Sequence, residues 1–338
     1  MKRSFPLLAL LCLALAIFVT ACQKADDSTE SSLTVAQTCS ECGRECPEGQ
    51  MLCDECDGKV VEAGEEVVVQ EFVPVEPAEP TYYADQPNTD LTGSSLSMSA
   101  DGKSQTLTLP GNVKLEMRKI PAGSFTMGSP TSEPGRWSGN ETQHEVTLTK
   151  DYWLGTFEVT QAQWQAVMGN NPSYFNGDDL PVGHVSWEDA KEFCEKLNND
   201  SFVKKPKGYL FDLPTEAQWE YACRAGTATA YYGNVEGIAW YGGNSDGEIQ
   251  PVGRKKPNAW GLYDMHGNVC EWCRDWFEDD YADDPEFLRR QASGSRRVCR
   301  GGCWNNPAEL CRSAKRGGRS PDRQSHDLGF RLALVPVQ

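Results

Sequence analysis

Residues 112–338 predict a loop-rich α+β domain, long enough to bury a core of its own. Three segments carry apolar residues at helical spacing, beginning after Thr160, Ser186 and Thr215. Short segments such as 145–148 and 298–300 predict strands, and Gly, Pro and Trp are abundant between these elements. Periodicity alone supports no more specific fold.

The three helices are predicted from their inward-facing residues and their starts. Ser186 and Asp189 resemble a capping box at the start of the second helix. The residues expected to face inward are Trp164, Val167, Ala190, Phe193, Cys194, Leu197, Trp219, Ala222 and Cys223.

Residues 1–21 predict a lipoprotein signal peptide. Lys2 and Arg3 precede an apolar run over 5–19, and Val-Thr-Ala stands directly before Cys22. A Cys at that place matches the bacterial lipobox, in which the thiol is lipidated; the alternative is a plain signal peptide with an incidental Cys. No second apolar run of about 20 residues follows, so we expect the lipid at Cys22 to be the membrane anchor. The residue after Cys22 is not Asp, which favours the bacterial outer membrane or cell surface.

Residues 22–60 contain a cluster of cysteines whose chemistry stays open. Cys39 and Cys42, and then Cys53 and Cys56, form two pairs with the spacing of tetrahedral zinc or iron ligands. A small disulfide cluster is the alternative that an exported protein favours. Cys46 is left over in both arrangements, so free or intermolecular thiols are a third interpretation.

Residues 61–111 predict a disordered stalk, because they are rich in Glu, Pro, Ser and Thr and lack helical periodicity. Between residues 23 and 110, 18 Asp and Glu stand against four Lys and Arg, which accounts for most of the net charge of −17. The acidity therefore belongs mainly to this region. An exported chain this acidic is not expected to bind nucleic acid.

The domain resembles a known family through an ordered set of motifs. These are Ile120–Gly128, Glu158–Thr160, Pro181–Trp187, Leu213–Tyr221, Asn258–Trp272 and a closing segment, which we define as residues 298–331. Together they resemble the formylglycine-generating enzyme, or sulfatase-modifying factor, family. The resemblance covers nearly all of 112–338 and implies a C-type-lectin-like α+β fold.

The resemblance fails at the catalytic cysteines. Enzymes of this family hold copper on two cysteines five positions apart, whereas Cys303 and Cys311 here are eight apart and fall on neither enzyme position. We therefore expect no copper and no catalytic residue. A formylglycine-generating oxidase is kept as an alternative.

A calcium site is implied by the same resemblance. Asp264 and Glu271 would contribute side chains, and Gly267 and Val269 would contribute backbone carbonyls, oxygen ligands that suit a hard cation. Glu158 matches a further calcium-associated position. The alternative is that Asp264 caps a turn and Glu271 pairs with an arginine.

The domain contains seven cysteines, for which disulfides are the default in an oxidising compartment. The resemblance implies a bridge between Cys223 and Cys311. The odd number leaves a free thiol, for which Cys194 is the candidate.

The closing segment is expected to bind a macromolecular ligand, either protein or glycan. The closing segment and the two arginines directly before it, residues 296–331, hold nine Lys and Arg against three acids, which predicts a positive patch. Its ending resembles the variable proteins of diversity-generating retroelements, a non-catalytic branch of the family; an invariant structural envelope lipoprotein is the alternative. The residues expected to point to solvent and contact the ligand are Asn306, Ala308, Glu309, Lys315, Arg319, Asp322, Gln324, His326 and Asp327.

Between those positions, the closing segment should hold itself to the core. Trp304, Ala314 and Phe330 are expected to be buried. Three arginines are expected to pair with interior carboxylates or carbonyls: Arg300, Arg316 and Arg331.

Overall fold

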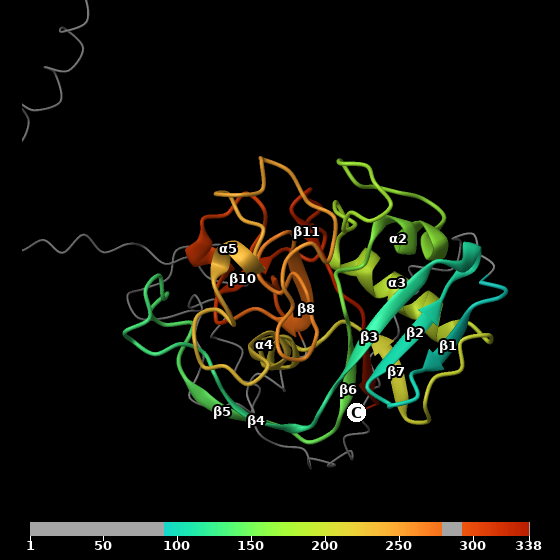
Figure 1. Cartoon of the computed structure of the whole chain (residues 1–338), viewed down its shortest axis with the longest axis horizontal. Helices are drawn as coiled ribbons and strands as arrows, with labels where there is room; N and C mark the ends of the chain where they lie inside the picture. The colour runs from blue at the N-terminus through green and yellow to red at the C-terminus, as the bar shows by residue number, and fades with distance from the viewer. Residues whose placement is uncertain (1–90, 279–292, 338) are drawn as a thin grey trace, which may run out of the picture. The chain divides into compact units, whose positions relative to one another are not determined.

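A computed structural model of the chain describes residues 91–278 and 293–337, in which the largest sheet has six antiparallel strands (Figure 1). In spatial order they are β1 (Ser95–Met98), β2 (Ser104–Thr108), β3 (Lys114–Ile120), β6 (Tyr152–Gly155), β12 (Ala333–Pro336) and β7 (Tyr209–Asp212). β12 follows the closing segment and lies between β6 and β7, which fixes the end of that segment inside the sheet.

A second sheet is built largely from the closing segment. Its order is β10 (Arg316–Arg319), β9 (Arg297–Arg300), β8 (Cys270–Trp276) and β11 (Leu328–Gly329), and only the pairing of β11 with β8 is parallel. A separate hairpin joins β4 (Gly123–Met127) to β5 (His144–Leu148). The predicted strands at 145–148 and 298–300 are confirmed.

The three predicted helices begin where the sequence predicted: α2 (Gln161–Met168), α3 (Trp187–Asn199) and α4 (Glu216–Arg224). The structure adds the short α5 (Val235–Ile238) and the 3₁₀ helices η2 (Pro110–Asn112) and η3 (Ala308–Cys311). Thr160, Ser186 and Thr215 each cap a helix through a reciprocal side-chain and backbone hydrogen-bond pair. All nine side chains predicted to face inward from these helices are buried.

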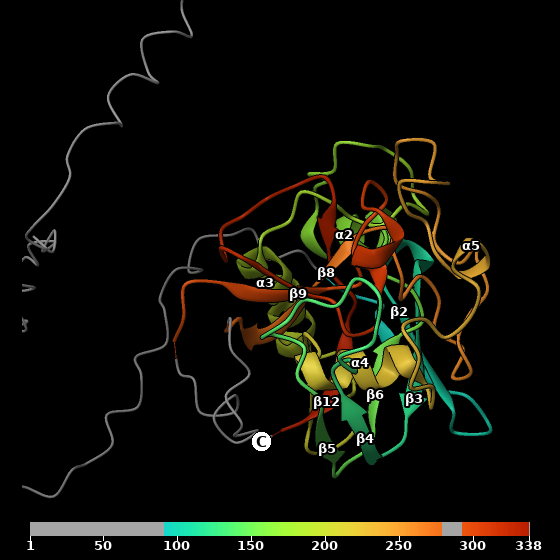
Figure 2. The same ribbon diagram turned by 90° about the vertical axis from the view of Figure 1, so that its left-hand side faces the viewer.

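Two groups of buried side chains form the core. One joins α2 and α3 to the sheets, where Trp164 stacks on Phe193 with ring centroids 5.7 Å apart and Phe330 meets Phe193 edge to face. The other surrounds α4, which packs against β4 of the hairpin and against β8 and β9 (Figure 2). Ala314 and Phe330 are fully buried, as predicted.

The predicted boundary between stalk and domain at residue 111 is wrong. β1 and β2 lie before it and pair in register onto β3, and Leu107 and Leu109 are buried. Serine and threonine on the outward face of β2 gave this stretch the composition of a stalk, while its alternating Leu residues belong to the core.

Several predictions fall outside the described residues. These are the signal peptide, the lipidated Cys22, the cysteines at 39, 42, 53 and 56, and the stalk up to residue 90. Within 91–278 and 293–337, the helices are too short or too polar to cross a membrane.

Candidate functional site

Buried arginines hold the closing segment to the core. Arg316 donates to both oxygens of Glu216 at 2.6 and 2.9 Å, and Arg331 donates to both oxygens of Glu271 at 2.6 Å. Arg300 pairs with Glu220. These contacts confirm the predicted roles of Arg300, Arg316 and Arg331.

A fourth arginine, which the sequence analysis did not single out, adds to this frame. Arg312 donates to both oxygens of Glu141 at 2.9 Å and to Glu133 at 2.5 Å. Three of the guanidinium groups also donate to a backbone carbonyl of a distant segment: Arg312 to Gly135 at 2.7 Å, Arg316 to Asn140 at 3.2 Å and Arg331 to Gly155 at 3.0 Å. Bidentate pairs of this kind fix geometry as well as charge, so the backbone of the closing segment is rigidly placed.

Most of the predicted ligand-contacting residues lie at the surface. Glu309, Arg319, Asp322, Gln324 and His326 are exposed, while Asn306, Ala308 and Asp327 are half-buried. Several of their side chains contact only near neighbours: Arg319 donates to the Gly318 carbonyl, Asn306 donates to Asn305, and Asp322 accepts from Ser320. The Gln324 amide donates to Asp189 at 2.9 Å, and Asp327 accepts from the Cys303 thiol at 3.5 Å.

Lys315 was predicted to face solvent, and this is wrong. Only 9% of the residue is exposed, and its Nζ lies 3.3 Å from the centroid of the Trp137 ring with no hydrogen-bond partner. Burial lowers the pKa of Lys315 to about 8. Trp137 belongs to the loop after β4 and covers the lysine, a contact that the local sequence does not encode.

The predicted positive patch is also wrong as a surface property. Five of its nine basic residues are buried, namely Arg300, Arg312, Lys315, Arg316 and Arg331. The exposed charges that remain are Arg319 and Arg323 against Glu309 and Asp322, while Arg296, Arg297 and Asp327 are half-buried. The basic residues stabilise the frame, and the exposed surface is close to neutral.

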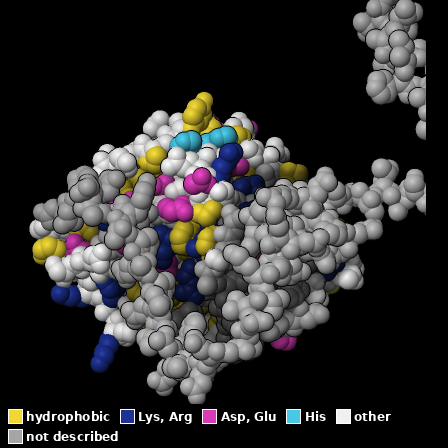
Figure 3. Space-filling view, turned by 180° about the vertical axis from the view of Figure 1, so that it is seen from behind, with side chains coloured by type: hydrophobic (Ala, Val, Ile, Leu, Met, Phe, Trp, Pro, Cys, Tyr) yellow, Lys and Arg dark blue, Asp and Glu magenta, His cyan; other side chains and the backbone are white. Residues whose placement is uncertain are grey.

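An aromatic cluster, consisting of Tyr174, Phe175, Trp304 and His326, adjoins the exposed residues. Trp304 was predicted to be buried in the core, but it is half-buried, because its ring rests edge-on against Phe175 at 5.9 Å and beside His326 at 5.6 Å. Tyr174 is 74% exposed and meets Phe175 at 5.0 Å. The face seen from behind carries histidine side chains next to hydrophobic ones (Figure 3).

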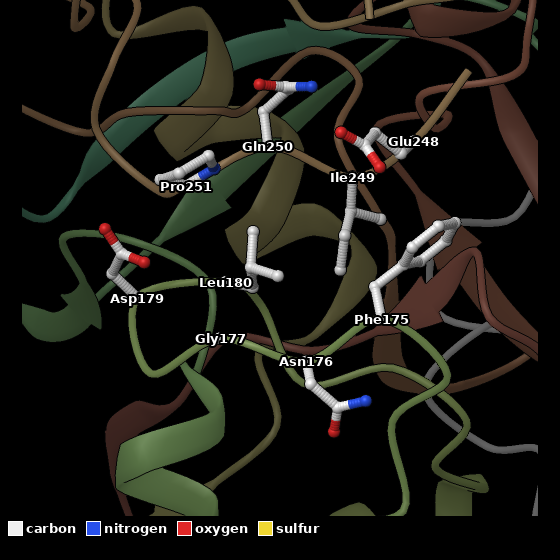
Figure 4. A pocket seen from close by; sticks show the side chains of 9 residues that line it. All are labelled: Phe175, Asn176, Gly177, Asp179, Leu180, Glu248, Ile249, Gln250 and Pro251. Carbon is white, nitrogen blue, oxygen red and sulfur yellow. The ribbon is translucent and has the colours of Figure 1, made fainter. Parts of the chain in front are cut away.

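A pocket of about 400 Å³ opens beside this cluster, with Phe175 belonging to both (Figure 4). Its walls come from two loops, 175–180 after α2 and 248–251 before the motif that begins at Asn258. Sequence reasoning missed these loops. A Tyr-Phe pair inside an otherwise polar stretch between α2 and Pro181 was the available signal.

Three carboxyl groups lie in the interior near Arg331. Asp264 Oδ2 accepts from the Gly253 amide at 2.7 Å, while its Oδ1 is buried without a partner. Burial raises the pKa of Asp264 to about 6, and burial together with the charges of Asp264 and Glu271 raises the pKa of Glu158 well above its usual range.

The fit of this group to calcium is partial. The unpaired Asp264 oxygen suits a cation, and Gly267 turns with a positive φ of 82° where a Cβ would collide with the Trp240 carbonyl. Glu271, however, is already engaged by Arg331 and by the Trp219 indole at 2.7 Å. Among the described residues, no three His, Cys, Asp or Glu side chains converge as a metal-ligand group.

The predicted Cys223–Cys311 disulfide is not formed. All seven cysteines among the described residues are free, including Cys194 as expected. The His266 ring contacts both residues instead: its Nδ1 donates to the Cys311 carbonyl at 2.7 Å, and its Nε2 faces the Cys223 thiol at 3.8 Å. Burial lowers the pKa of His266 to about 4, so the ring is neutral and can accept from the thiol.

Cys303 and Cys311 are both buried thiols. Burial raises the pKa of the Cys311 thiol to about 12 and raises that of Cys303 far above its usual range. The fold therefore brings the two cysteines into the domain without activating them.

Comparison with known proteins decides the family. The sulfatase-modifying factor enzyme 1-like domain matches residues 108–335. This chain belongs to that family. The C-type-lectin-like α+β fold of formylglycine-generating enzymes, expected from the motifs, is confirmed.

The proteins to which this chain is similar, among solved structures and curated sequences, have names that describe different roles. The structure of Treponema denticola variable protein 1 is 35% identical, with a TM-score of 0.61, and the match covers 69% of this chain and 99% of that one. Chaperone protein LppX of Paenibacillus barcinonensis is 33% identical over 53% of this chain and 79% of its own length. The formylglycine-generating enzyme of Streptomyces coelicolor is 33% identical over 54% of this chain and 60% of the enzyme.

Proposed function

We propose that this chain binds a macromolecular ligand, a protein or a glycan, through the exposed side chains of the closing segment. The observation that carries the proposal is the contrast between a frame fixed by four buried arginine–carboxylate pairs and the freely exposed residues mounted on it. A rigid backbone loses little conformational entropy on binding, so most of the contact energy is available for affinity.

We further propose that the domain is displayed on the bacterial outer membrane or cell surface by a lipid at Cys22, and that a diversity-generating retroelement rewrites the closing segment. The likeness to a protein named as variable supports this. A near-copy of the end of the gene, differing only at adenines and lying beside a reverse transcriptase gene, is the expected genomic sign. Without it, an invariant envelope lipoprotein is the better interpretation.

The oxidase alternative is less well supported, because Cys303 and Cys311 are eight positions apart, not five, and both are buried. Calcium bound at Asp264, with carbonyls of Gly267 and Val269, is proposed as a structural ion beneath the binding surface. Glu271 would complete the set only by sharing its oxygens with Arg331.

The binding proposal is tested by replacing Glu309, Arg319, Asp322, Gln324 and His326 together. Substitutions at exposed positions change stability by less than about 0.5 kcal/mol each, so the melting temperature should stay nearly constant. Capture of ligands on arrays of glycans and surface proteins should be lost or redirected. A control variant changes exposed residues on the far sheet, Ser97 and Glu116, and should capture as the wild type does. If the five-residue variant captures the same ligands with unchanged affinity, the closing segment is not the binding surface.

A further inference from the structure

The pocket beside the aromatic cluster has an apolar floor and an acidic rim. Leu180 and Ile249 point toward each other across its centre, with Phe175 and Pro251 at the sides (Figure 4). Its ionisable lining residues, Asp179 and Glu248, are both acids and both exposed. A pocket of this size and lining is ordinary for a bound ligand or for an anchoring side chain of a partner.

The charge of the pocket is only partly compensated. Asp179 lies 3.5 Å from Arg254 in a pair whose side chains are 61% and 65% exposed, an arrangement of low stability that a ligand can displace. Among the described residues, no cationic side chain pairs with Glu248. The pocket therefore offers carboxylate oxygens to an incoming cation.

Several hydrogen-bond donors that line the pocket are already engaged. The backbone amides of Gly177, Leu180 and Gln250 already donate inside the protein, at 3.1, 3.1 and 2.9 Å. The Gln250 side chain donates to the Ser245 carbonyl and, like that of Asn176, points away from the cavity (Figure 4). A sugar hydroxyl needs partners for its oxygen as well as its proton, whereas ammonium and guanidinium groups only donate. Since both ionisable residues of the lining, Asp179 and Glu248, are acids, the lining favours a cation.

We propose that this pocket takes a lysine or arginine side chain of a protein ligand. The aliphatic stem would lie over Leu180 and Ile249, and the charged head would meet Glu248 beside the Phe175 ring, with Asp179 on the opposite side of the pocket (Figure 4). In this geometry cation–π attraction adds to the ion pair. Phe175 joins the pocket to Trp304 and His326, so a ligand anchored here also reaches the closing segment. This inference rests on the proposed function and selects the protein class of ligand.

The test adds small peptides to the full chain. The peptides are short enough to report on binding in the pocket alone. The probe is acetyl-Gly-Arg-Gly-amide, and its matched control carries citrulline, a neutral isostere of arginine. Binding is followed by saturation-transfer NMR at low salt. A hydrogen bond to a charged group contributes roughly 1.5–3 kcal/mol, so the citrulline peptide should bind about tenfold or more weakly. Glu248→Gln should weaken the arginine peptide to the same degree and leave the citrulline peptide unchanged.

The control variant is Glu116→Gln, which removes an exposed carboxylate of β3 outside both the pocket and the closing segment and should leave peptide binding unchanged. Equal binding of both peptides, or no saturable binding of either, overturns the proposal. If n-butylguanidinium binds and the peptide does not, the pocket serves a free small cation and the assignment to a protein ligand is wrong. Because these peptides do not depend on the closing segment, their result is separate from ligand capture by the five-residue variant.

Discussion

At the scale of single residues, the interior of this domain contains charged side chains whose burial the local sequence does not reveal. Lys315 stands between Ala314 and Arg316, both buried, and its polar character alone led to its assignment as a contact residue. Its amine is covered by Trp137, a residue far away in the sequence. Such a position can be found only when the fold is known, because burial by a distant loop leaves no local periodicity.

Lys315→Met should stabilise the domain at neutral pH. The folded-state pKa is lowered from 10.5 to about 8, so the unfolded chain holds the proton more tightly and the lysine weakens the fold below pH 8. This penalty is relieved as pH rises from about 8 through 10.5. In urea unfolding, the methionine variant should therefore have a larger free energy of unfolding than the wild type at pH 7, and this difference should shrink by pH 10. Lys103→Met, at an exposed site, is the control; a less stable methionine variant at pH 7 would contradict the burial argument.

At the scale of elements, local signals were readable and non-local ones were not. The three capped helices were predicted correctly because their capping residues are close in the sequence. In α3, for example, the capping partners Ser186 and Asp189 lie within one turn of each other. β1 and β2 were missed because their identity depends on pairing with β3, and a Ser- and Thr-rich strand has the same composition as a linker. The loops around Phe175 and Ile249 were missed for the same reason: a pocket between distant loops has no sequence period.

The strongest inter-element link is the one that joins α4 to the closing segment. Glu220 accepts from Arg224 at 2.9 Å, from the Gly128 amide at 2.8 Å and from Arg300, all in the interior. Glu220→Ala leaves two buried guanidinium groups without their carboxylate, which should cost roughly 3–5 kcal/mol. Arg254→Ala breaks the exposed pair with Asp179 and should cost less than about 1 kcal/mol. Chemical denaturation compares the two, and similar losses would mean that Glu220 does not hold the frame.

At the scale of the whole molecule, the proposed binding residues and the residues that stabilise the fold lie in different layers. Arginines that looked like a ligand-facing patch lie inside and tie the closing segment to α4, β8 and the loop after β4. The outer layer is consequently free to change, since its residues carry little of the folding energy. A variable surface needs this separation, because each new sequence must fold on the same frame.

Calcium bound in the interior would raise the stability of the whole domain. If it binds at Asp264, the folded state gains about 2.7 kcal/mol at a calcium concentration 100 times the Kd, which corresponds to several degrees in melting temperature for a domain of this size. Chelation should lower the melting temperature by that amount. Asp264→Asn is the informative variant, because Asn tolerates the positive φ of 56° and can still accept from Gly253, while it removes the charge. Glu271→Ala is a poor test, since it leaves Arg331 buried and unpaired whether or not calcium binds. The asparagine variant should melt at the same temperature with and without chelator; a wild-type protein equally indifferent to chelator would mean that the buried carboxylates are compensated by Arg331 alone.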